Sequence, residues 1–205
     1  MTEEIQHTKP FNMIIVGMTA CGKTKYLLDT LEQNYMCHFE YIFLLCPTFK
    51  HNNTYRLWRY ESDEDYLVIP CDQDQVDHWL RYIVQNFKGT NSLIILDDCA
   101  SSKGVKGRTS ELVKLGFAAR HYGFSTIVIT QQLTSIAKPY RENISKLVSF
   151  YNPNKKDMQE IFDDYLGSVS KEEEANIKKT LKNQKYSRLE IDLVHPYKHK
   201  VTTCV

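Results

Sequence analysis

Eight residues near the N-terminus, GMTACGKT at 17–24, have the residue types and the spacing of a phosphate-binding loop. Gly17 and Gly22 stand where the backbone must wrap closely around an anion, and Lys23 and Thr24 come next. In this pattern the lysine reaches the β- and γ-phosphates of a nucleoside triphosphate, while the threonine hydroxyl binds Mg²⁺. Backbone N–H groups at the start of the following helix also point at the phosphates. The residues predicted to contact the nucleotide are Gly17, Ala20, Cys21, Gly22, Lys23, Thr24 and Lys25.

Two neighbouring carboxylates, Asp97 and Asp98, follow an apolar run in LIILDD at 93–98. Downstream of a phosphate loop, such a strand end supplies one acid that holds Mg²⁺ and a second acid that polarises the attacking water. Acids at a strand end can also form a solvated turn or cap a helix, but the upstream loop favours the catalytic interpretation. Asp98 is shorter than the glutamate of many ATPases, so its water would lie nearer the backbone. The sequence therefore predicts Thr24 and Asp97 as metal ligands, and Asp98 and Lys23 as catalytic residues.

These groups must be positioned by strands and helices, and the hydrophobic pattern predicts where those lie. Apolar, strand-like runs occur at 13–17, 41–46, 66–70, 92–98, 125–132, 146–152 and 186–194. Helical spacing or capping patterns predict helices at 22–35, 76–87, 109–122, 157–166 and 170–182. Continuous apolar strands that alternate with helices indicate an α/β fold, with a mostly parallel sheet covered by helices on both faces. The phosphate loop thus joins a strand to a helix, as anion binding requires.

Length and composition are those of one globular domain. The 205 residues suffice for a core at about 12–152 and a helix–strand extension at about 153–205. The formal net charge is +1, and no apolar run approaches the roughly 18 residues of a membrane span. The N-terminus also lacks the basic and then apolar order of a secretory signal. We therefore expect an intracellular protein with no membrane segment.

The order of the motifs along the chain resembles that of one superfamily. After the acidic pair comes ARHYGFSTIVITQQ at 119–132, in which Arg-x-x-Gly precedes an apolar run that ends in Thr-Gln. Phosphate loop, acidic strand end, Arg-x-x-Gly and Thr-Gln, in this order, resemble the FtsK-HerA superfamily of ring-forming DNA translocases. Within it, LIILDDCASS, AARHYGFSTIVITQQ and LEIDLVHPYKHKV resemble the genome-packaging ATPases of large eukaryotic DNA viruses, the poxvirus-like type, and their relatives in virus-derived transposons. The resemblance covers most of the chain, roughly 12–200.

This resemblance implies a RecA-like P-loop NTPase core that hydrolyses ATP with Mg²⁺ as cofactor. It also implies a homo-oligomeric ring, a pentamer or a hexamer, that moves double-stranded DNA through its channel into a viral capsid. Portal or vertex proteins of the capsid would then be partners. The protein would act in the host cell cytoplasm or at a viral assembly site, and it could remain with the virion.

The resemblance further assigns two residues of the 119–132 segment. Arg120 matches the arginine finger, which reaches the γ-phosphate bound by a neighbouring subunit. Gln131 matches the glutamine that senses the γ-phosphate and positions the attacking water. The alternative role for Arg120 is that of a cation complementing the dipole at a helix C-terminus. Arg108 and Arg141 are the other candidates for the finger.

A basic segment that contains glycines, CASSKGVKGRTS at 99–110, lies between Asp98 and the next predicted helix. Its Lys103, Lys106 and Arg108 are predicted to bind DNA phosphates from a flexible loop. Such binding would be independent of sequence and sensitive to salt. A solvated loop without a ligand is the alternative.

One residue of the phosphate loop has chemistry of its own. Cys21 lies beside the N-terminus of a predicted helix. The positive end of a helix dipole favours a thiolate, so we expect Cys21 to be alkylated and a bound nucleotide to protect it.

Other classes of protein fit part of the pattern. NKKD at 154–157 matches the guanine-specificity motif N-K-x-D, but the acidic pair is not followed by the D-x-x-G of a signalling GTPase, and Asn154 or Asp157 can instead cap a helix. A nucleoside monophosphate kinase would be similar in size to this chain. However, it needs an arginine-rich lid, and the Thr-Gln residues at the strand end would have no role in it. A non-hydrolysing DNA-binding or scaffold protein would not need the phosphate loop and the acidic pair together.

Overall fold

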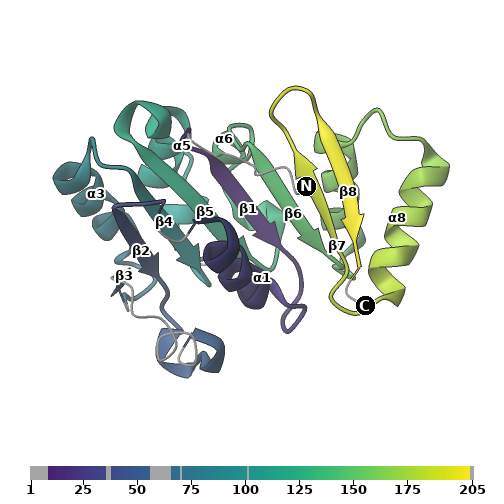
Figure 1. The fold of residues 1–205 in the computed structure, drawn as a ribbon, viewed down its shortest axis with the longest axis horizontal. Coiled ribbons are helices and arrows are strands. Elements are labelled where there is room, and N and C mark those ends of the chain that lie inside the picture. The colour runs from purple at the N-terminus through teal and green to yellow at the C-terminus, as the bar shows by residue number, and fades with distance from the viewer. Residues whose placement is uncertain (1–8, 36–37, 56–65, 70, 101, 204–205) are drawn as a thin grey trace.

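In the part of the chain that the computed structural model describes, residues 9–35, 38–55, 66–69, 71–100 and 102–203, eight strands form one sheet (Figure 1). Their order across the sheet is β3-β2-β4-β5-β1-β6-β7-β8. The strands are β1 Asn12–Val16, β2 Tyr41–Leu45, β3 Tyr66–Ile69, β4 Ser92–Asp97, β5 Phe124–Thr130, β6 Lys146–Phe150, β7 Arg188–Asp192 and β8 Lys198–Thr202. Neighbouring strands from β3 to β6 run parallel, whereas β7 and β8 are added antiparallel beyond β6. The predicted, mostly parallel α/β fold is confirmed.

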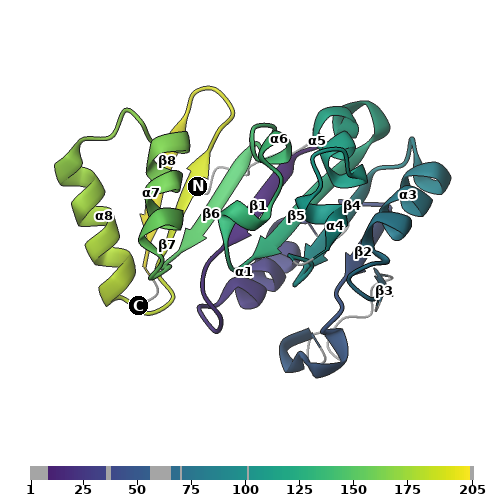
Figure 2. The same ribbon diagram turned by 180° about the vertical axis from the view of Figure 1, so that it is seen from behind.

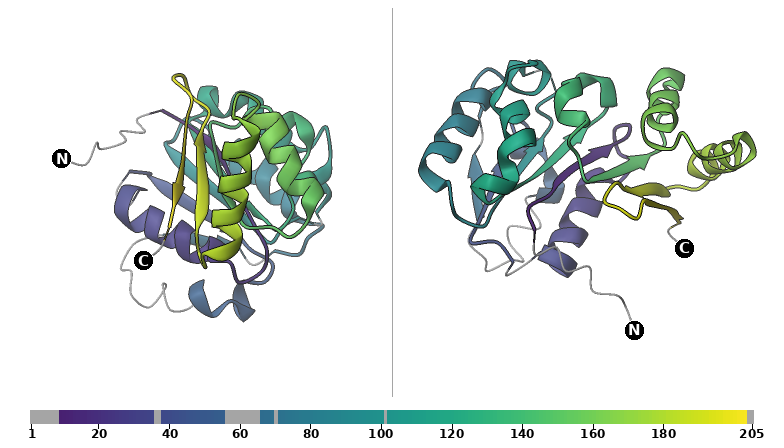
Figure 3. Two further views of the ribbon diagram at one scale, coloured as in Figure 1. Left: turned by 90° about the vertical axis from the view of Figure 1, so that its right-hand side faces the viewer. Right: turned by 90° about the horizontal axis from the view of Figure 1, so that it is seen from above.

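Helices cover both faces of this sheet. They are α1 Lys23–Thr30, α3 Val76–Phe87, α4 Lys103–Lys106, α5 Glu111–Tyr122, α6 Lys138–Arg141, α7 Lys155–Tyr165 and α8 Lys171–Asn183, with the short η1 Leu31–Tyr35, η2 Phe49–His51 and η3 Leu133–Ser135. α1 lies on the near face in Figure 1, and α3, α5, α6, α7 and α8 lie on the face seen in Figure 2. The view from above in Figure 3 separates the two layers. Among the described helices, none combines the length and the hydrophobicity that crossing a bilayer requires.

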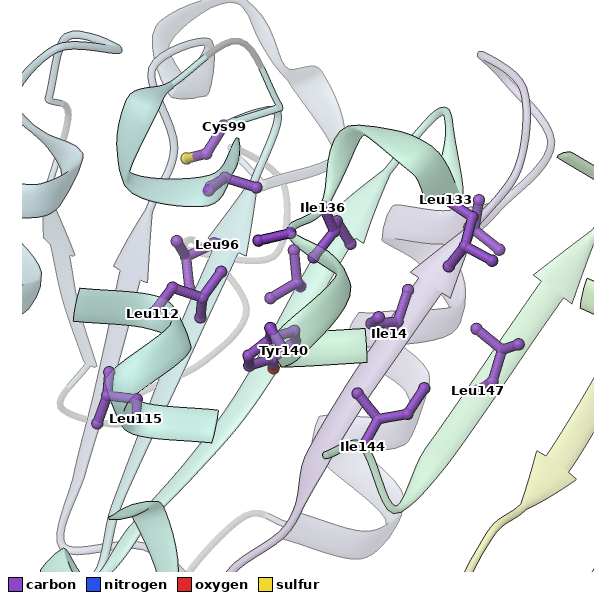
Figure 4. Close-up of a cluster of buried hydrophobic side chains, with 14 of the residues drawn as sticks. Ile14, Leu96, Cys99, Leu112, Leu115, Leu133, Ile136, Tyr140, Ile144 and Leu147 are labelled. Carbon is purple, nitrogen blue, oxygen red and sulfur yellow. The ribbon is translucent and has the colours of Figure 1, made fainter. Parts of the chain in front are cut away.

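The two faces of the sheet bury separate hydrophobic clusters. Along β1, Ile14 packs on the side of α5 and α6, and its neighbour Met13 packs on the side of α1. Figure 4 shows Ile14 in the first cluster with Tyr140 of α6 and Leu112 of α5. Because side chains alternate between faces along a strand, a strand covered on both faces must be apolar throughout. This is why the central strands were visible in the sequence as continuous apolar runs.

The register of the central strands aligns the residues that follow them. Val16 of β1 pairs with Thr130 of β5, and Asp97 of β4 pairs with Ile129 of β5. Parallel strands end at one edge of the sheet, and ligands of open α/β sheets bind at that edge. The phosphate loop after β1, the acidic pair at the end of β4 and Gln131 after β5 therefore meet there.

The C-terminal part differs from the predicted helix–strand extension. The run at 186–194 is not the last strand, because the chain turns back and adds β8 along β7. The sequence of β8, KHKVT, is basic and mostly exposed, so no apolar pattern reveals it. It is held by its pairing with β7 and by a 3.0 Å contact between His199 Nε2 and Glu173 Oε1 of α8.

Candidate nucleotide-binding site

The phosphate loop forms the turn between β1 and α1, as predicted. Gly22, which precedes the first residue of α1, has a φ of 103°, a left-handed conformation that glycine adopts without strain. A Cβ on Gly17 would lie 2.7 Å from the Cβ of Phe150, so a larger residue would clash. Lys23 Nζ donates 2.8 Å hydrogen bonds to the carbonyl oxygens of Gly17 and Met18. These bonds hold the ammonium group against the loop that would wrap a phosphate.

A cavity of about 530 Å³ opens beside this loop at the carboxyl edge of the sheet. Its lining brings together five of the six predicted catalytic and metal-binding residues, which are Lys23, Thr24, Asp97, Asp98 and Gln131. Ala20 also lines this cavity, whereas Gly22 and Lys25 line an adjoining one. Part of the remaining wall comes from a segment that the sequence did not single out, with Thr48, Asn52 and Thr54.

Asp97 is a buried carboxylate with a specific partner. Its side chain lies in the interior, at 7% exposure, and Tyr55 Oη donates a 2.8 Å hydrogen bond to its Oδ2. Burial raises the pKa of Asp97 from its ordinary value of 3.8 to about 6, while the bond from Tyr55 acts in the opposite direction. Tyr55 is fully buried and follows no motif, so the sequence offered no signal for it. The pair fixes the orientation of the carboxylate that faces the cavity.

Asp98 faces the same cavity because the chain turns at this residue. Successive side chains of a strand point to opposite faces, so two adjacent acids on a straight strand would diverge. Asp98 instead has a φ of 56°, in the left-handed region that aspartate tolerates better than most residues. Gln73 Nε2 donates a 2.5 Å hydrogen bond to the carbonyl oxygen of Asp98 and braces this turn. Gln73 is a second supporting residue that sequence patterns did not indicate.

The backbone of Gln131 is held by a hydrogen bond from a residue after β6. Asn152, after β6, donates a 3.0 Å hydrogen bond from Nδ2 to the carbonyl oxygen of Gln131. The same amide group donates a 3.2 Å bond to Asp157 Oδ2. The Gln131 side chain itself is exposed toward the cavity that it lines. The segment after β5 is thus tied to β6 and α7, while the amide group of Gln131 faces the ligand space.

The NKKD segment has a structural role in this chain. Asn154 Oδ1 accepts a 3.0 Å hydrogen bond from the backbone N–H of Lys156 and so caps α7, as one of the two interpretations predicts. Asp157 is buried and accepts bonds from Asn152 and from Thr134 Oγ1. Among the described residues that line either cavity, none belongs to 154–157. The motif therefore offers no contact for a guanine base here.

The three arginines considered for a finger differ in their surroundings. Arg120 is exposed in the last turn of α5, at the opposite end of β5 from the cavity. The seven residues of β5 span about 20 Å, so Arg120 does not reach a nucleotide bound by its own chain. Arg141 is buried, and its Nη1 lies 2.7 Å from Glu160 and 3.5 Å from Asp164. Arg108 is exposed, so Arg120 and Arg108 are the two arginines of this set that a neighbouring subunit can reach.

The basic segment is not the irregular loop that its glycines predict. Lys103–Lys106 form the short α4, which Ser102 caps by accepting a 2.9 Å bond from the N–H of Gly104. Val105 is fully buried, and this apolar anchor overrides the preference of glycine for loops. The cationic side chains of Lys103, Lys106 and Arg108 remain exposed, and Lys106 also lines the cavity of the phosphate loop.

The pKa of Cys21 is shifted in the direction that disfavours the thiolate, contrary to the expected effect of the helix N-terminus. Burial raises the pKa of the Cys21 thiol above its ordinary value. The nearby ammonium group of Lys23, whose Nζ lies 3.9 Å from Sγ, opposes this effect without cancelling it. The Cys21 side chain is partly buried, and its Sγ lies 2.8 Å from where a Cβ on Gly17 would be.

The oxygen donors of the cavity fit a magnesium ion that arrives with a nucleotide. The hydroxyl of Thr24 and the carboxylate of Asp97 both line the cavity, and Mg²⁺ prefers oxygen ligands of this kind. Within the described residues, no group of three or more His, Cys, Asp and Glu side chains could hold a metal alone. Phosphate oxygens and water would have to complete the coordination, as is usual for Mg²⁺ in nucleotide sites.

The fold and this site together define the chain as a P-loop NTPase. The sequence profile described as "Poxvirus A32 protein" matches residues 2–196, and the chain therefore belongs to that family. The predicted resemblance to the poxvirus-like type of packaging ATPase is confirmed at the level of the family.

Individual relatives are similar in sequence, and solved structures share the fold. The "DNA packaging protein OPG160" of variola virus is 24% identical over 147 residues, which cover 69% of this chain and 53% of the relative. The chain spans about half the length of the curated relatives that it matches. The genome packaging NTPase B204 of Sulfolobus turreted icosahedral virus 2, in complex with AMP, has a TM-score of 0.69 at 16% identity, with 96% of this chain and 98% of that chain covered. The DNA-packaging ATPase B204 of Sulfolobus turreted icosahedral virus has a TM-score of 0.69 at 17% identity, with 96% and 99% covered.

Proposed function

We propose that this chain is the ATPase subunit of a motor that drives double-stranded DNA into a viral capsid. The observation that carries the proposal is the convergence of the phosphate loop, the acidic pair and Gln131 on one cavity. The relatives' names, a DNA packaging protein and genome-packaging NTPases, support DNA as the translocated substrate. Portal or vertex proteins of the capsid are the proposed partners, and the proposed place of action is a viral assembly site in the host cytoplasm.

The cavity residues divide the chemistry of hydrolysis among them. Lys23 neutralises charge on the β- and γ-phosphates. Thr24 and Asp97 hold Mg²⁺, which supplies further neutralisation of the phosphate oxygens. Asp98 accepts a proton from the attacking water, and Gln131 orients that water toward the γ-phosphorus.

The proposed assembly is a homo-oligomeric ring, a pentamer or a hexamer. Arg120 supports it, because an exposed arginine at the end of the molecule opposite the cavity can serve a neighbour's nucleotide and not its own. Hydrolysis would then depend on correct contact between subunits. Such dependence couples each hydrolysis event to the ring that grips the DNA.

Steady-state ATPase activity, measured with and without duplex DNA over a range of protein concentrations, tests this proposal. We expect DNA to stimulate hydrolysis and the specific activity to rise with protein concentration, since the finger comes from another subunit. Lys23→Ala serves as the control for contaminating activity. An activity that is independent of both DNA and concentration would contradict the motor and indicate a monomeric phosphotransferase.

The cations of the α4 region are proposed to contact the DNA backbone. Replacing Lys103, Lys106 and Arg108 together by alanine is expected to lower the slope of log affinity against log salt by about three, since each lost phosphate contact lowers it by about one. Fluorescence anisotropy with a labelled duplex, without nucleotide, measures this slope. A matched control replaces Lys171, Lys179 and Lys182, which are exposed on α8. If both triple variants keep the wild-type slope, the α4 region does not bind DNA.

A further inference from the structure

A second cavity, of about 680 Å³, adjoins the first. Both cavities are lined by Ala20, Lys23, Thr24 and Thr54, so they share residues of the phosphate loop. Asp97, Asp98 and Gln131 line only the first cavity. The second cavity is lined instead by the start of α1 and by Phe150, Tyr186 and Arg188. The phosphate loop thus lies between the first cavity, which holds the acidic pair and Gln131, and the second cavity, which has aromatic residues in its lining.

This asymmetry sets the direction of a bound triphosphate. The γ-phosphate must face the first cavity, because the groups that would hold Mg²⁺ and orient water are there. The α-phosphate and the nucleoside must then pass Lys23 and Thr24 into the second cavity, since these two residues line both. We propose that the second cavity binds the nucleoside and that the planar base stacks on the ring of Tyr186. The proposal rests on the proposed ATPase function and adds the base-binding half of its site.

A fixed turn presents Tyr186 to this cavity. The residue is 44% exposed, and its φ of 63° lies in the left-handed region, which is uncommon for an aromatic residue. Its neighbour Ser187 is buried and donates a 2.7 Å hydrogen bond from Oγ to the carbonyl oxygen of Gln184. A Cβ on Gly22 would lie 3.2 Å from Cδ1 of Tyr186, so the ring packs beside the phosphate loop. An unfavourable backbone conformation that holds a ring partly exposed is typical of ligand-binding positions.

Arg188 forms a second part of the same wall. Its guanidinium carbon lies 4.7 Å from the centre of the Tyr26 ring, and its Nε donates a 2.9 Å hydrogen bond to Oε1 of the buried Glu190. These contacts hold a positive charge at the cavity that receives the α-phosphate and the ribose. Tyr186 and Arg188 both come from the C-terminal region, so that region completes the nucleotide site of the core.

The residues that line the second cavity favour stacking on the base over hydrogen bonds that select one particular base. Of the described residues that line this cavity, Asp29 alone carries a carboxylate, and its Oδ1 lies 2.5 Å from Lys25 Nζ. A guanine-specific pocket needs acceptors for the N–H groups on the edge of the base. Aromatic stacking tolerates every base because each base has a π face. Stacking on Tyr186 therefore serves nucleoside triphosphates as a class, and Thr30, Gln33 and Thr54 of the same lining supply neutral hydrogen-bonding groups.

Isothermal titration of the full chain with MgATP, MgGTP and magnesium tripolyphosphate tests this assignment. Tyr186→Gly removes the ring and suits the left-handed backbone, so folding is preserved. We expect this variant to bind ATP and GTP about 5- to 150-fold more weakly, the range that loss of stacking on one aromatic ring produces. Its affinity for tripolyphosphate, which has no base, is expected to equal that of the wild type. Tyr186→Phe restores the ring and with it the affinity for both nucleotides, and Tyr82→Ala, at an exposed tyrosine of α3, is the matched control.

Two results would overturn the base-binding assignment alone. One is an ATP affinity that Tyr186→Gly leaves unchanged, and the other is an equal loss for ATP and tripolyphosphate, which would mean a disturbed loop. A wild-type chain that binds neither ATP nor tripolyphosphate would overturn the proposed ATPase function as well. The tripolyphosphate measurement thus separates failure of the base pocket from failure of the whole site.

Discussion

An Arg120→Ala variant is expected to hydrolyse ATP about 10³-fold more slowly than the wild-type chain, while it binds ATP with unchanged affinity. A fixed cation on the γ-phosphoryl oxygens stabilises the charge that develops in the transition state, and its loss costs about 10³–10⁵ in rate. Arg120 is exposed and lies at the far end of β5 from its own cavity, so its removal leaves the binding residues of the same chain intact. Steady-state hydrolysis and isothermal titration with MgATP measure the two quantities.

Mixing two inactive variants tests whether the arginine acts between subunits. A Lys23→Ala subunit keeps Arg120, and an Arg120→Ala subunit keeps the phosphate loop, so a mixed ring contains complete sites at some interfaces. We expect the mixture to recover part of the wild-type rate. A mixture no faster than its separate components would contradict the role of Arg120 in trans. The same experiment with Arg108→Ala tests the other exposed arginine, and His121→Ala, at the adjacent exposed residue of α5, is the matched control.

The parts of the site that could be predicted are those whose chemistry depends on local spacing. The phosphate loop needs its glycines, lysine and threonine within eight residues, and the acidic pair needs only the end of a buried strand. The central strands could be predicted because burial on both faces leaves a continuous apolar run in the sequence. β8 could not, since its basic, exposed residues form a strand only through pairing with β7.

The residues that sequence reasoning missed act through contacts between distant segments. Tyr55 bonds to Asp97 across 42 positions of sequence, and Tyr186 reaches the loop only because β7 lies next to β6. In the α4 region, Gly104 lies inside a helix next to the fully buried Val105, and Gly107 follows the end of that helix. At Cys21, burial outweighs both the helix N-terminus and the charge of Lys23. In each case the tertiary environment determines the contact, the local structure or the pKa, and the local sequence does not indicate it.

An Asp97→Asn variant is expected to lose Mg²⁺-dependent hydrolysis and to gain stability above pH 6. In the folded chain burial raises the pKa of Asp97 to about 6, from an ordinary value of 3.8. Between these pH values the folded state holds a proton that the unfolded state has released. The contribution of Asp97 to stability is therefore full below about pH 4 and is lost as the pH rises through 6. The difference between the two pKa values corresponds to about 3 kcal/mol at most.

Asparagine has nearly the shape of aspartate and can accept the hydrogen bond from Tyr55, but it carries no charge that burial penalises. Urea unfolding at pH 4 and pH 8 should therefore show a free energy of unfolding that falls less with rising pH in Asp97→Asn than in the wild type. Asp98→Asn is the matched control, because Asp98 is less buried and asparagine also tolerates its left-handed backbone. It should lower hydrolysis, and because the charge of Asp98 contributes to the raised pKa of Asp97, it should weaken the pH dependence of stability less than Asp97→Asn does. An identical pH dependence in the wild type and Asp97→Asn would mean that burial of the charged Asp97 carboxylate does not lower the stability of the folded chain. The view that this chain keeps an unfavourable carboxylate in order to hold Mg²⁺ would then fail.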